Sequence, residues 1–248
     1  LMQKIGYDIN KIIDSRLEKK ILDEIDIADY IVCTSKHTYQ SYIDNKISKN
    51  KLILNPSGIN INKFYYQPNS NKSKKFKYLF AGNLSKRKGI DIVLKAYSKI
   101  RNSDTQLILA GFIEKSQKDL VRQYLKFKDI VFLGKVKNSE MHKLYSSCHL
   151  LLVVSAEEGF AAVIGESLAS GLPVLCSQNS GGSHFIKDKE HGKVLKTNSL
   201  EELLETMEDF KSLKENIENN KVKISEYFRN NYSWRKSTEN LIAILDNL

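Results

Sequence analysis

The sequence has few of the features that stabilise secreted or membrane-spanning proteins. Its 248 residues include only three cysteines, Cys33, Cys148 and Cys176, with no C-x-x-C pair. Each cysteine lies in or beside an apolar run, so we expect buried thiols in a reducing compartment rather than disulfides or a metal site. No apolar run reaches the roughly 18 residues that cross a bilayer, and we expect no signal peptide. The sequence therefore predicts a soluble, cytoplasmic protein.

Several motifs of other enzyme classes are also absent. The five histidines have no metal-ligand spacing relative to carboxylates or cysteines, so we expect no metal site. There is no G-x-x-x-x-G-K-[ST] loop and no G-x-S-x-G elbow, which argues against an ATPase and a serine hydrolase. We expect no resident cofactor.

Negative charge is scarce relative to positive charge. The formal net charge is +10 and the isoelectric point is about 9.3. Three polyanionic partners fit this excess: a nucleotide diphosphate, an anionic membrane face, or nucleic acid. The lysines are spread over most of the predicted helices instead of gathering with aromatic residues in one stripe. We therefore expect no nucleic-acid partner.

From residue 77 onward, apolar strands alternate with amphipathic helices. Strands are predicted at 77–81, 106–110, 130–133, 149–154, 174–177 and 193–195, and helices at 89–100, 114–127, 139–147 and 161–170. This alternation predicts an α/β fold, a Rossmann-like parallel sheet with helices on both faces. Ser199-x-x-Glu202 is a capping box that opens a further helix. The highly charged residues 208–230 predict a solvated helix.

The ends of the chain have their own pattern. Apolar residues at helical spacing predict a helix over 9–27, and a strand, a helix and a second strand follow over 29–54. Residues 65–75 are polar and turn-rich, which is typical of a linker. The terminal stretch 232–248 predicts an amphipathic helix.

The stretch around which the chain is organised is 155–177. It follows an apolar strand, Leu150 to Val154, and passes through an acidic turn into a short helix. Two carboxylates, Glu158 in the turn and Glu166 in the helix, have seven residues between them. Doubly wound sheets bind ligands at the carboxyl ends of their strands. One carboxylate and the helix amino-terminal amides can therefore face the same ligand.

A second turn concentrates positive charge. Residues 82–89 place Lys86, Arg87 and Lys88 between a strand end and a helix start, where backbone amides already favour anions. A diphosphate would gain charge-assisted hydrogen bonds there. The alternative is an ordinary solvated basic loop.

These motifs carry a family resemblance. The acidic stretch resembles the E-x7-E motif, usually EGFG…EAMA.G.PV, of the retaining GT-B glycosyltransferases of the "group 1" family. The residues that carry it are Glu158-Gly159-Phe160 and Glu166-Ser167-Leu168-Ala169-Ser170-Gly171-Leu172-Pro173-Val174. The resemblance implies the carboxy-terminal half of a GT-B fold, a nucleotide-sugar donor, and a glycan or lipid-linked sugar as acceptor. Ala161 departs from the family, which usually has glycine there.

The resemblance also implies roles at the diphosphate. Lys88 matches the lysine that grips the donor diphosphate and is a candidate catalytic residue. Gly82 opens the same turn, and Asn83 stands where the family usually has arginine. Arg87 is a candidate replacement for that missing charge.

Further donor contacts follow from the acidic stretch. Glu158 resembles the glutamate at the donor sugar, the second candidate catalytic residue, and Glu166 the one that accepts ribose hydroxyls. The resemblance places the amides of Phe160, Ala161 and Ala162 where they could stabilise the leaving diphosphate.

Three residues of another turn complete the predicted donor site. Gly134, Lys135 and Val136 resemble the turn beside the nucleotide base, and Gly159 belongs to the acidic turn. The Asn179–Gly182 turn resembles one below the donor sugar, although the acidic residue that usually follows it is absent.

The resemblance suggests three segments. Residues 1–55 match the tail of an amino-terminal acceptor domain, 56–231 a nucleotide-sugar-binding Rossmann-like domain, and 232–248 a carboxy-terminal crossover helix. Most of the amino-terminal domain is then missing, so the chain is a fragment, pairs with a separate partner subunit, or is a compact natural protein.

The predicted function is sugar transfer from a nucleotide-diphosphate sugar to an acceptor hydroxyl, in surface polysaccharide or glycoconjugate synthesis. The alternative is a non-catalytic nucleotide-sugar-binding or partner subunit of a split glycosyltransferase. A location at the inner face of the membrane would suit the basic charge.

Overall fold

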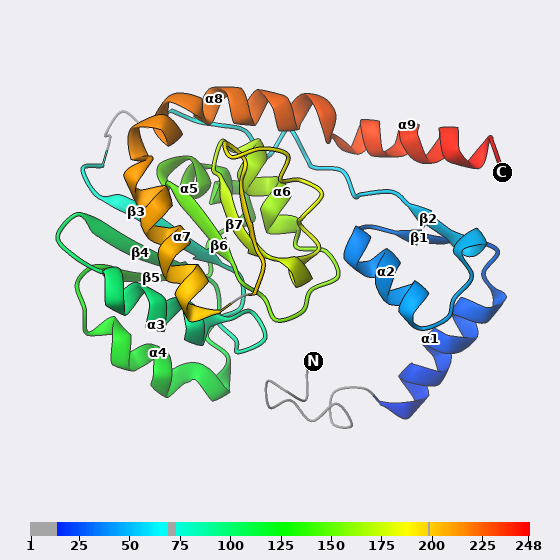
Figure 1. Ribbon diagram of the computed structural model, residues 1–248, viewed down its shortest axis with the longest axis horizontal. Coiled ribbons are helices and arrows are strands. Elements are labelled where there is room, and N and C mark those ends of the chain that lie inside the picture. Colours follow the sequence, from blue (N-terminus) through cyan, green and yellow to red (C-terminus); the bar gives the residue numbers. More distant parts are fainter. Residues whose placement is uncertain (1–13, 69–72, 198) are drawn as a thin grey trace.

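The computed structural model describes residues 14–68, 73–197 and 199–248, and its main body is a six-stranded parallel sheet in the order β5-β4-β3-β6-β7-β8 (Figure 1). The strands are β3 Phe76–Ala81, β4 Thr105–Ala110, β5 Ile130–Gly134, β6 Leu150–Val153, β7 Val174–Ser177 and β8 Gly192–Leu195. Each begins and ends within one residue of the predicted strand. The predicted parallel α/β sheet is confirmed.

Helices cover both faces of this sheet. One face carries α3 Ile90–Ile100, α4 Lys118–Leu125 and α7 Leu200–Ser212, and the other carries α5 Met141–Ser147, α6 Ala162–Ala169 and most of α8 Lys214–Asn231. Strands β6 and β7 are buried along their whole length. This explains their continuous apolar sequences, because a parallel strand packs side chains on both of its faces.

At one position in the sheet, between β3 and β6, the chain connections that follow two neighbouring strands run in opposite directions along the sheet. The chain builds β3, β4 and β5 outward, then returns to place β6 on the other side of β3. The turns that follow β3 and β6 therefore leave the same edge of the sheet side by side. In doubly wound sheets this switch point is where ligands bind.

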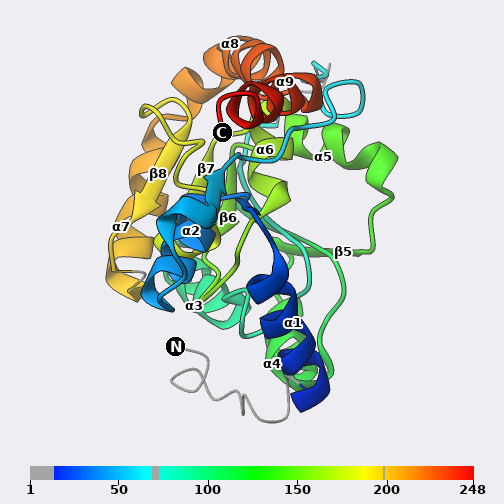
Figure 2. The same ribbon diagram turned by 90° about the vertical axis from the view of Figure 1, so that its right-hand side faces the viewer.

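A smaller unit precedes the sheet. It contains α1 Ser15–Ile27, β1 Ile31–Cys33, α2 Lys36–Asp44, the short 3₁₀ helix η3 Lys49–Lys51 and β2 Leu52–Leu54, with β1 and β2 paired in parallel. Figures 1 and 2 show it beside the main sheet. Residues 9–13 of the predicted first helix lie outside the described residues. Helix α1 buries none of its side chains.

The prediction of a solvated helix over 208–230 is wrong. The segment breaks at Leu213 into α7 and α8, and α8 buries Ile217, Ile224 and Phe228. It also buries Lys221, which is 1% exposed. The buried positions of α8 recur with helical spacing, so this charged segment contains an apolar stripe, and the stripe packs on α6.

Polar contacts at buried Lys221 explain how a charge is tolerated there. Its ammonium group donates to the carbonyl oxygens of Ser146 at 2.9 Å and Cys148 at 2.8 Å, and lies 2.9 Å from the Glu218 carboxylate. His149 lies 3.0 Å from the same carboxylate. Buried charges persist when they are paired and hydrogen-bonded in this way.

The last helix, α9 Trp234–Leu245, returns to the smaller unit (Figure 1). The Ile59 amide donates to the Tyr232 carbonyl at 2.7 Å, and the Trp234 amide donates to the Ile59 carbonyl at 3.3 Å. The Asn240 side chain donates to Asn55 at 2.8 Å, just after β2. Residues 55–64, which follow β2 and are called the linker from here on, are therefore joined to the start of α9 by both backbone and side-chain hydrogen bonds.

The cysteines and the helix lengths bear on two predictions that were made from composition. Cys33, Cys148 and Cys176 are all buried and unpaired, as predicted. In the part of the chain that the structure describes, every helix is too short or too polar to cross a membrane.

Candidate functional site

The two turns at the switch point meet in an ion pair. The Lys88 ammonium group contacts the Glu158 Oε1 atom, and Ser155 donates a hydrogen bond of 3.1 Å to Oε2 of the same carboxylate. The Lys88 and Glu158 side chains are only 18% and 16% exposed. The predicted basic and acidic turns thus converge at the carboxyl ends of β3 and β6.

The basic turn is anchored to the neighbouring strand and to the acidic turn. The Gly82 amide donates to the Ala110 carbonyl at 2.9 Å, at the end of β4. Arg87 donates from Nη1 to the Glu157 carbonyl at 3.0 Å, so its guanidinium group lies along the acidic turn. Asn83 is exposed. The Arg87 guanidinium group, the candidate replacement for the charge that Asn83 lacks, is therefore held at the edge of the site.

The acidic turn rests on the Asn179–Gly182 turn. The Glu158 amide donates to the Asn179 carbonyl at 2.7 Å, and the Ala161 amide donates to the Ser180 carbonyl at 3.2 Å. Gly181 has a φ of 66°, and a Cβ there would collide with the Gly159 carbonyl. Glycine is needed at that position because it tolerates both the backbone angle and the close approach.

These bonds bear on the three amides proposed for the diphosphate. The Ala161 amide already has an acceptor within the protein. In the described segments, the amides of Phe160 and Ala162 donate to no other residue. They lie before and at the first residue of α6, where amides have no acceptor within the helix. Two of the three amides therefore remain available to a ligand.

The smaller unit also contacts the acidic turn, which the sequence did not indicate. Ser35 and Thr38 donate from their hydroxyl groups to the Gly159 carbonyl, at 2.5 and 3.0 Å. Ser35 is fully buried and also caps α2 by accepting from the Thr38 amide. No local pattern announces such a contact, because the partners are more than 120 residues apart.

Glu166 lies in α6 with a partner that the sequence analysis missed. Tyr145, fully buried in α5, donates from its hydroxyl to Glu166 Oε2 at 3.0 Å. Burial raises the pKa of the Glu166 carboxyl above its ordinary value, and the Tyr145 hydrogen bond and the Lys63 charge oppose that shift. The hydrogen bond holds one carboxylate oxygen in place.

A cavity of about 320 Å³ lies against this carboxylate. Its lining includes three predicted site residues, Phe160, Ala162 and Glu166, together with residues of α6, the linker and α9. The volume is at the lower end of those seen for small-molecule sites. The remaining lining residues are Ser57, Gly58, Ile59, Asn60, Phe64, Gly165 and Trp234.

The turn predicted to contact a base lies further along the same edge of the sheet. Gly134 ends β5 and accepts a hydrogen bond of 2.8 Å from the Gly111 amide. Lys135 is exposed and its ammonium group lies 5.6 Å from the centre of the Phe112 ring, whereas Val136 is partly buried. Two strand spacings separate β5 from β3, about 10 Å. This turn therefore flanks the switch point rather than forming part of it.

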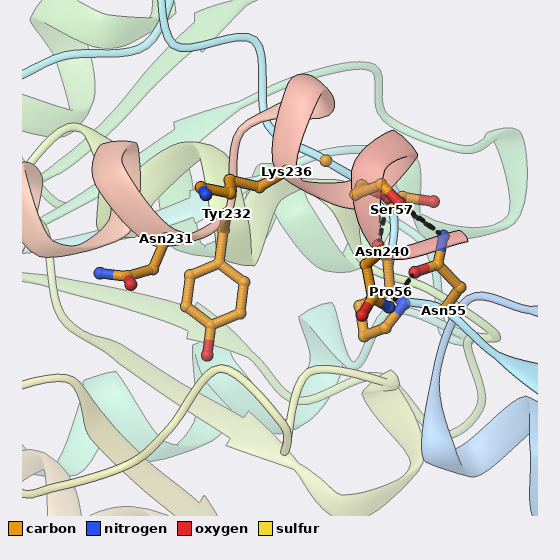
Figure 3. A pocket seen from close by; sticks show the side chains of 9 residues that line it. Asn55, Pro56, Ser57, Asn231, Tyr232, Lys236 and Asn240 are labelled. Carbon is orange, nitrogen blue, oxygen red and sulfur yellow. Dashed lines mark hydrogen bonds between the residues drawn. The ribbon is translucent and has the colours of Figure 1, made fainter. Parts of the chain in front are cut away.

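A second cavity, of about 270 Å³, contains none of the predicted site residues. It lies where the linker crosses the start of α9, and Figure 3 shows the Asn55, Ser57 and Asn240 side chains gathered on one side of it. The Tyr232 ring points away from this cluster (Figure 3). The cavity belongs to the junction between the two units.

Metal ligands do not gather in the described ranges of the chain. No three His, Cys, Asp or Glu side chains within residues 14–68, 73–197 and 199–248 lie close enough together to hold an ion.

Several solved structures share this fold, and glycosyltransferases are among them. Anabaena HepE in complex with UDP matches with a TM-score of 0.80 at 17% identity, over 96% of this chain and 70% of that one. Sucrose-phosphate synthase from Thermosynechococcus elongatus matches with a TM-score of 0.75 at 20% identity, over 93% and 61%. The expected fold class, a Rossmann-like half of a GT-B glycosyltransferase fold, is confirmed.

Sequence comparison gives the family. Residues 62–230 match the family described as glycosyl transferases group 1, and the chain belongs to it. An uncharacterized glycosyltransferase of Methanocaldococcus jannaschii is 25% identical over 99% of this chain and 63% of its own length. The lipopolysaccharide 1,2-N-acetylglucosaminetransferase of Salmonella typhimurium is 32% identical over 44% of this chain and 32% of its length. The chain spans 63%, 30% and 60% of the first three curated relatives, less than two thirds of each.

Proposed function

We propose that this chain is the donor-binding part of a retaining glycosyltransferase that moves a sugar from a nucleotide-diphosphate sugar to an acceptor hydroxyl. The ion pair between Lys88 and Glu158 at the switch point carries this proposal. It brings a cation suited to a diphosphate and a carboxylate suited to sugar hydroxyls into contact at the edge of the sheet where ligands bind. The family membership and the HepE structures with UDP and UDP-glucose support it.

In this proposal the turn from Gly82 to Gly89 binds the diphosphate. As the acceptor hydroxyl oxygen bonds to the sugar carbon, the bond between sugar and diphosphate breaks and leaves its electron pair, and hence negative charge, on the diphosphate oxygen, which can take up the proton that the hydroxyl loses. Lys88 and the amides of Phe160 and Ala162 offset that charge, and preorganised donors of this kind can contribute several kcal/mol to transition-state stabilisation. No metal is needed for this role if these groups supply the positive charge.

The carboxylates have different tasks. Glu158 accepts hydrogen bonds from the donor sugar and Glu166 from the ribose hydroxyls, with one Glu166 oxygen held by Tyr145. Gly134, Lys135 and Val136 flank the base, about two strand spacings away from β3.

Isothermal titration calorimetry with UDP, GDP and ADP tests the proposal, with and without EDTA. We expect at least one nucleotide to bind, and to bind equally well in EDTA. The uncharged nucleosides serve as controls and should bind much more weakly, because they lack the diphosphate. If no nucleotide binds at millimolar concentration, the assignment of a donor site is wrong.

The non-catalytic alternative rests on Asn83 and on the sequence Ser183-His184-Phe185, where the family has an acidic residue. Several of the relatives are named as transferases, which favours catalysis. A sugar-transfer assay of the chain co-expressed with a candidate partner separates the two. Tight donor binding without transfer to any acceptor would support the alternative.

We further propose that an additional domain or partner subunit packs on α1 and binds the acceptor, a surface glycan or lipid-linked sugar. Several apolar side chains of α1 are exposed, although an amphipathic helix usually packs its apolar face against the rest of the protein. The exposed fractions are 44–80% for Leu17, Ile21, Leu22 and Ile27. Co-expression with that domain or subunit should protect α1 amides from hydrogen exchange. Unchanged exchange in α1 would contradict this placement.

A further inference from the structure

Trp234 is the only tryptophan in the sequence, and it is 55% exposed. Several other bulky aromatic side chains, among them Tyr78, Tyr97 and Tyr145, are fully buried. A half-exposed indole offers a large apolar face together with a polar N–H group, a combination that favours a binding surface. Its place at the first residue of α9 determines what it can reach.

The backbone of Trp234 is fixed against the linker. Its amide donates to the Ile59 carbonyl at 3.3 Å, and Ser233 before it forms a bridge with Ile59. A Cβ on Gly58 would collide with the Trp234 backbone, so only glycine permits this approach. The indole is therefore attached at a defined position and not at a loose chain end.

Trp234 lines the same cavity of about 320 Å³ as Glu166. Phe64 and Phe160 line it as well, so the cavity combines aromatic surface with one anchored carboxylate. A sugar ring presents hydroxyl groups at its rim and C–H groups on its faces. The carboxylate can accept hydrogen bonds from vicinal hydroxyls while the C–H face packs on an aromatic ring.

We propose that Trp234 forms the aromatic wall of a sugar-ring subsite opposite Glu166, so that the carboxy-terminal helix contributes directly to donor binding. The ligand is a ring of the nucleotide sugar, either the ribose or the transferred hexose. This inference rests on the proposed function, since it takes Glu166 to be a sugar-contacting residue. It adds a residue outside the 62–230 segment that matches the family.

A single tryptophan allows a direct test. Fluorescence is excited at the red edge of the indole band, where uracil does not absorb, during titration with UDP and with UDP-glucose. We expect ligand to change the emission and to protect the indole from quenching by acrylamide at least twofold. If UDP is sufficient to produce the response, the ring is the ribose. If UDP-glucose produces the response and UDP does not, the ring is the hexose. Both support the subsite.

Calorimetry on the same samples distinguishes this inference from the proposed function. Heat of binding without any change in indole emission or quenching overturns the subsite and leaves the proposed function intact. Absence of binding heat with UDP, GDP and ADP alike overturns both. Binding heat without an indole response would mean that the exposed indole contacts something other than the donor.

Variants complete the test. We expect Trp234→Leu, which keeps bulk without a flat ring, to weaken nucleotide-sugar binding about tenfold, and Trp234→Phe to lose less. Ile242→Ala, on the same helix and 52% exposed but outside the cavity, is the matched control and should bind normally. If Trp234→Leu is folded by circular dichroism and binds within twofold of the unchanged chain, the indole makes no useful contact and the inference fails.

Discussion

At the scale of single residues, the cation of the switch point is the first to test. Replacing Lys88 with Met removes the ammonium group while keeping most of the aliphatic length. We expect UDP affinity to fall about 10- to 100-fold, since hydrogen bonds to charged groups contribute about 1.5–3 kcal/mol. Lys86→Met, in the same turn but exposed, is the control and should change affinity less than threefold. Equal losses in both variants would mean that the turn acts only through its overall charge.

Glu166 should lower the stability of the empty protein at neutral pH. Burial raises its pKa, so the native state holds this proton more tightly than the unfolded chain does. Its contribution to the free energy of unfolding is therefore greatest below the ordinary pKa of glutamate and falls as the pH rises through the raised value. Glutamine keeps the acceptor for Tyr145 but does not titrate.

We therefore expect Glu166→Gln to melt about 2 °C higher than the unchanged chain near pH 7.5, with a smaller difference near pH 4. The same variant should bind UDP at least tenfold more weakly, because the amide accepts fewer hydrogen bonds from ribose hydroxyls. Thermal melts and calorimetry measure the two effects. A melting difference that does not depend on pH would show that this carboxyl is not the group responsible.

At the scale of elements, α8 is held by a buried charge network. We expect Lys221→Met to destabilise the chain by about 2–4 kcal/mol, because the Ser146 and Cys148 carbonyls and the Glu218 carboxylate lose their donor. Lys223→Met in the same helix removes an exposed ion pair with Glu190 and should leave the unfolding curve nearly unchanged, because solvent screens such pairs. Urea unfolding measures both. Similar values for the two variants would contradict the assigned role of Lys221.

The same network predicts acid sensitivity. Burial alone would raise the pKa of Glu218, but the hydrogen bond with His149 and the Lys221 charge outweigh it and hold the pKa at about 2. A lowered carboxyl pKa stabilises the native state above the ordinary glutamate pKa and loses that effect as the pH falls towards 2. We expect Glu218→Gln to flatten the loss of stability between about pH 4.5 and pH 2. An unchanged acid profile would assign that loss to other carboxylates.

The elements also show what the sequence could and could not predict. The strands and the positions of the basic and acidic turns were predicted correctly because β-strand burial and turn chemistry are local in the sequence. The apolar stripe of α8 was missed because Lys221 lies within it. A lysine is tolerated there only because its ammonium group donates to the Ser146 and Cys148 carbonyls, which are tertiary contacts. The hydroxyl of Tyr145 on Glu166 was missed for the same reason, since nothing local marks which tyrosine will face a carboxylate.

At the scale of the whole molecule, the net charge of +10 supports the proposal of a location at an anionic membrane surface. We expect the chain to co-sediment with vesicles containing phosphatidylglycerol but not with pure phosphatidylcholine vesicles. Each lysine near such a surface contributes about 1 kcal/mol and is screened by salt, so about 0.5 M NaCl should release the protein. Binding to both kinds of vesicle, or binding that resists salt, would contradict an electrostatic attachment.

The polypeptide passes twice between its smaller and larger units, through the linker after Asn55 and again at the start of α9. Since these crossings are hydrogen-bonded to each other through Ile59 and Asn240, they define an axis about which the units could rotate with little disruption. The hydroxyls of Ser35 and Thr38 also donate to the Gly159 carbonyl, which belongs to the larger unit. Any rotation that separates the units would have to break these two hydrogen bonds, so the acidic turn connects the two units as well as contributing to the proposed donor site.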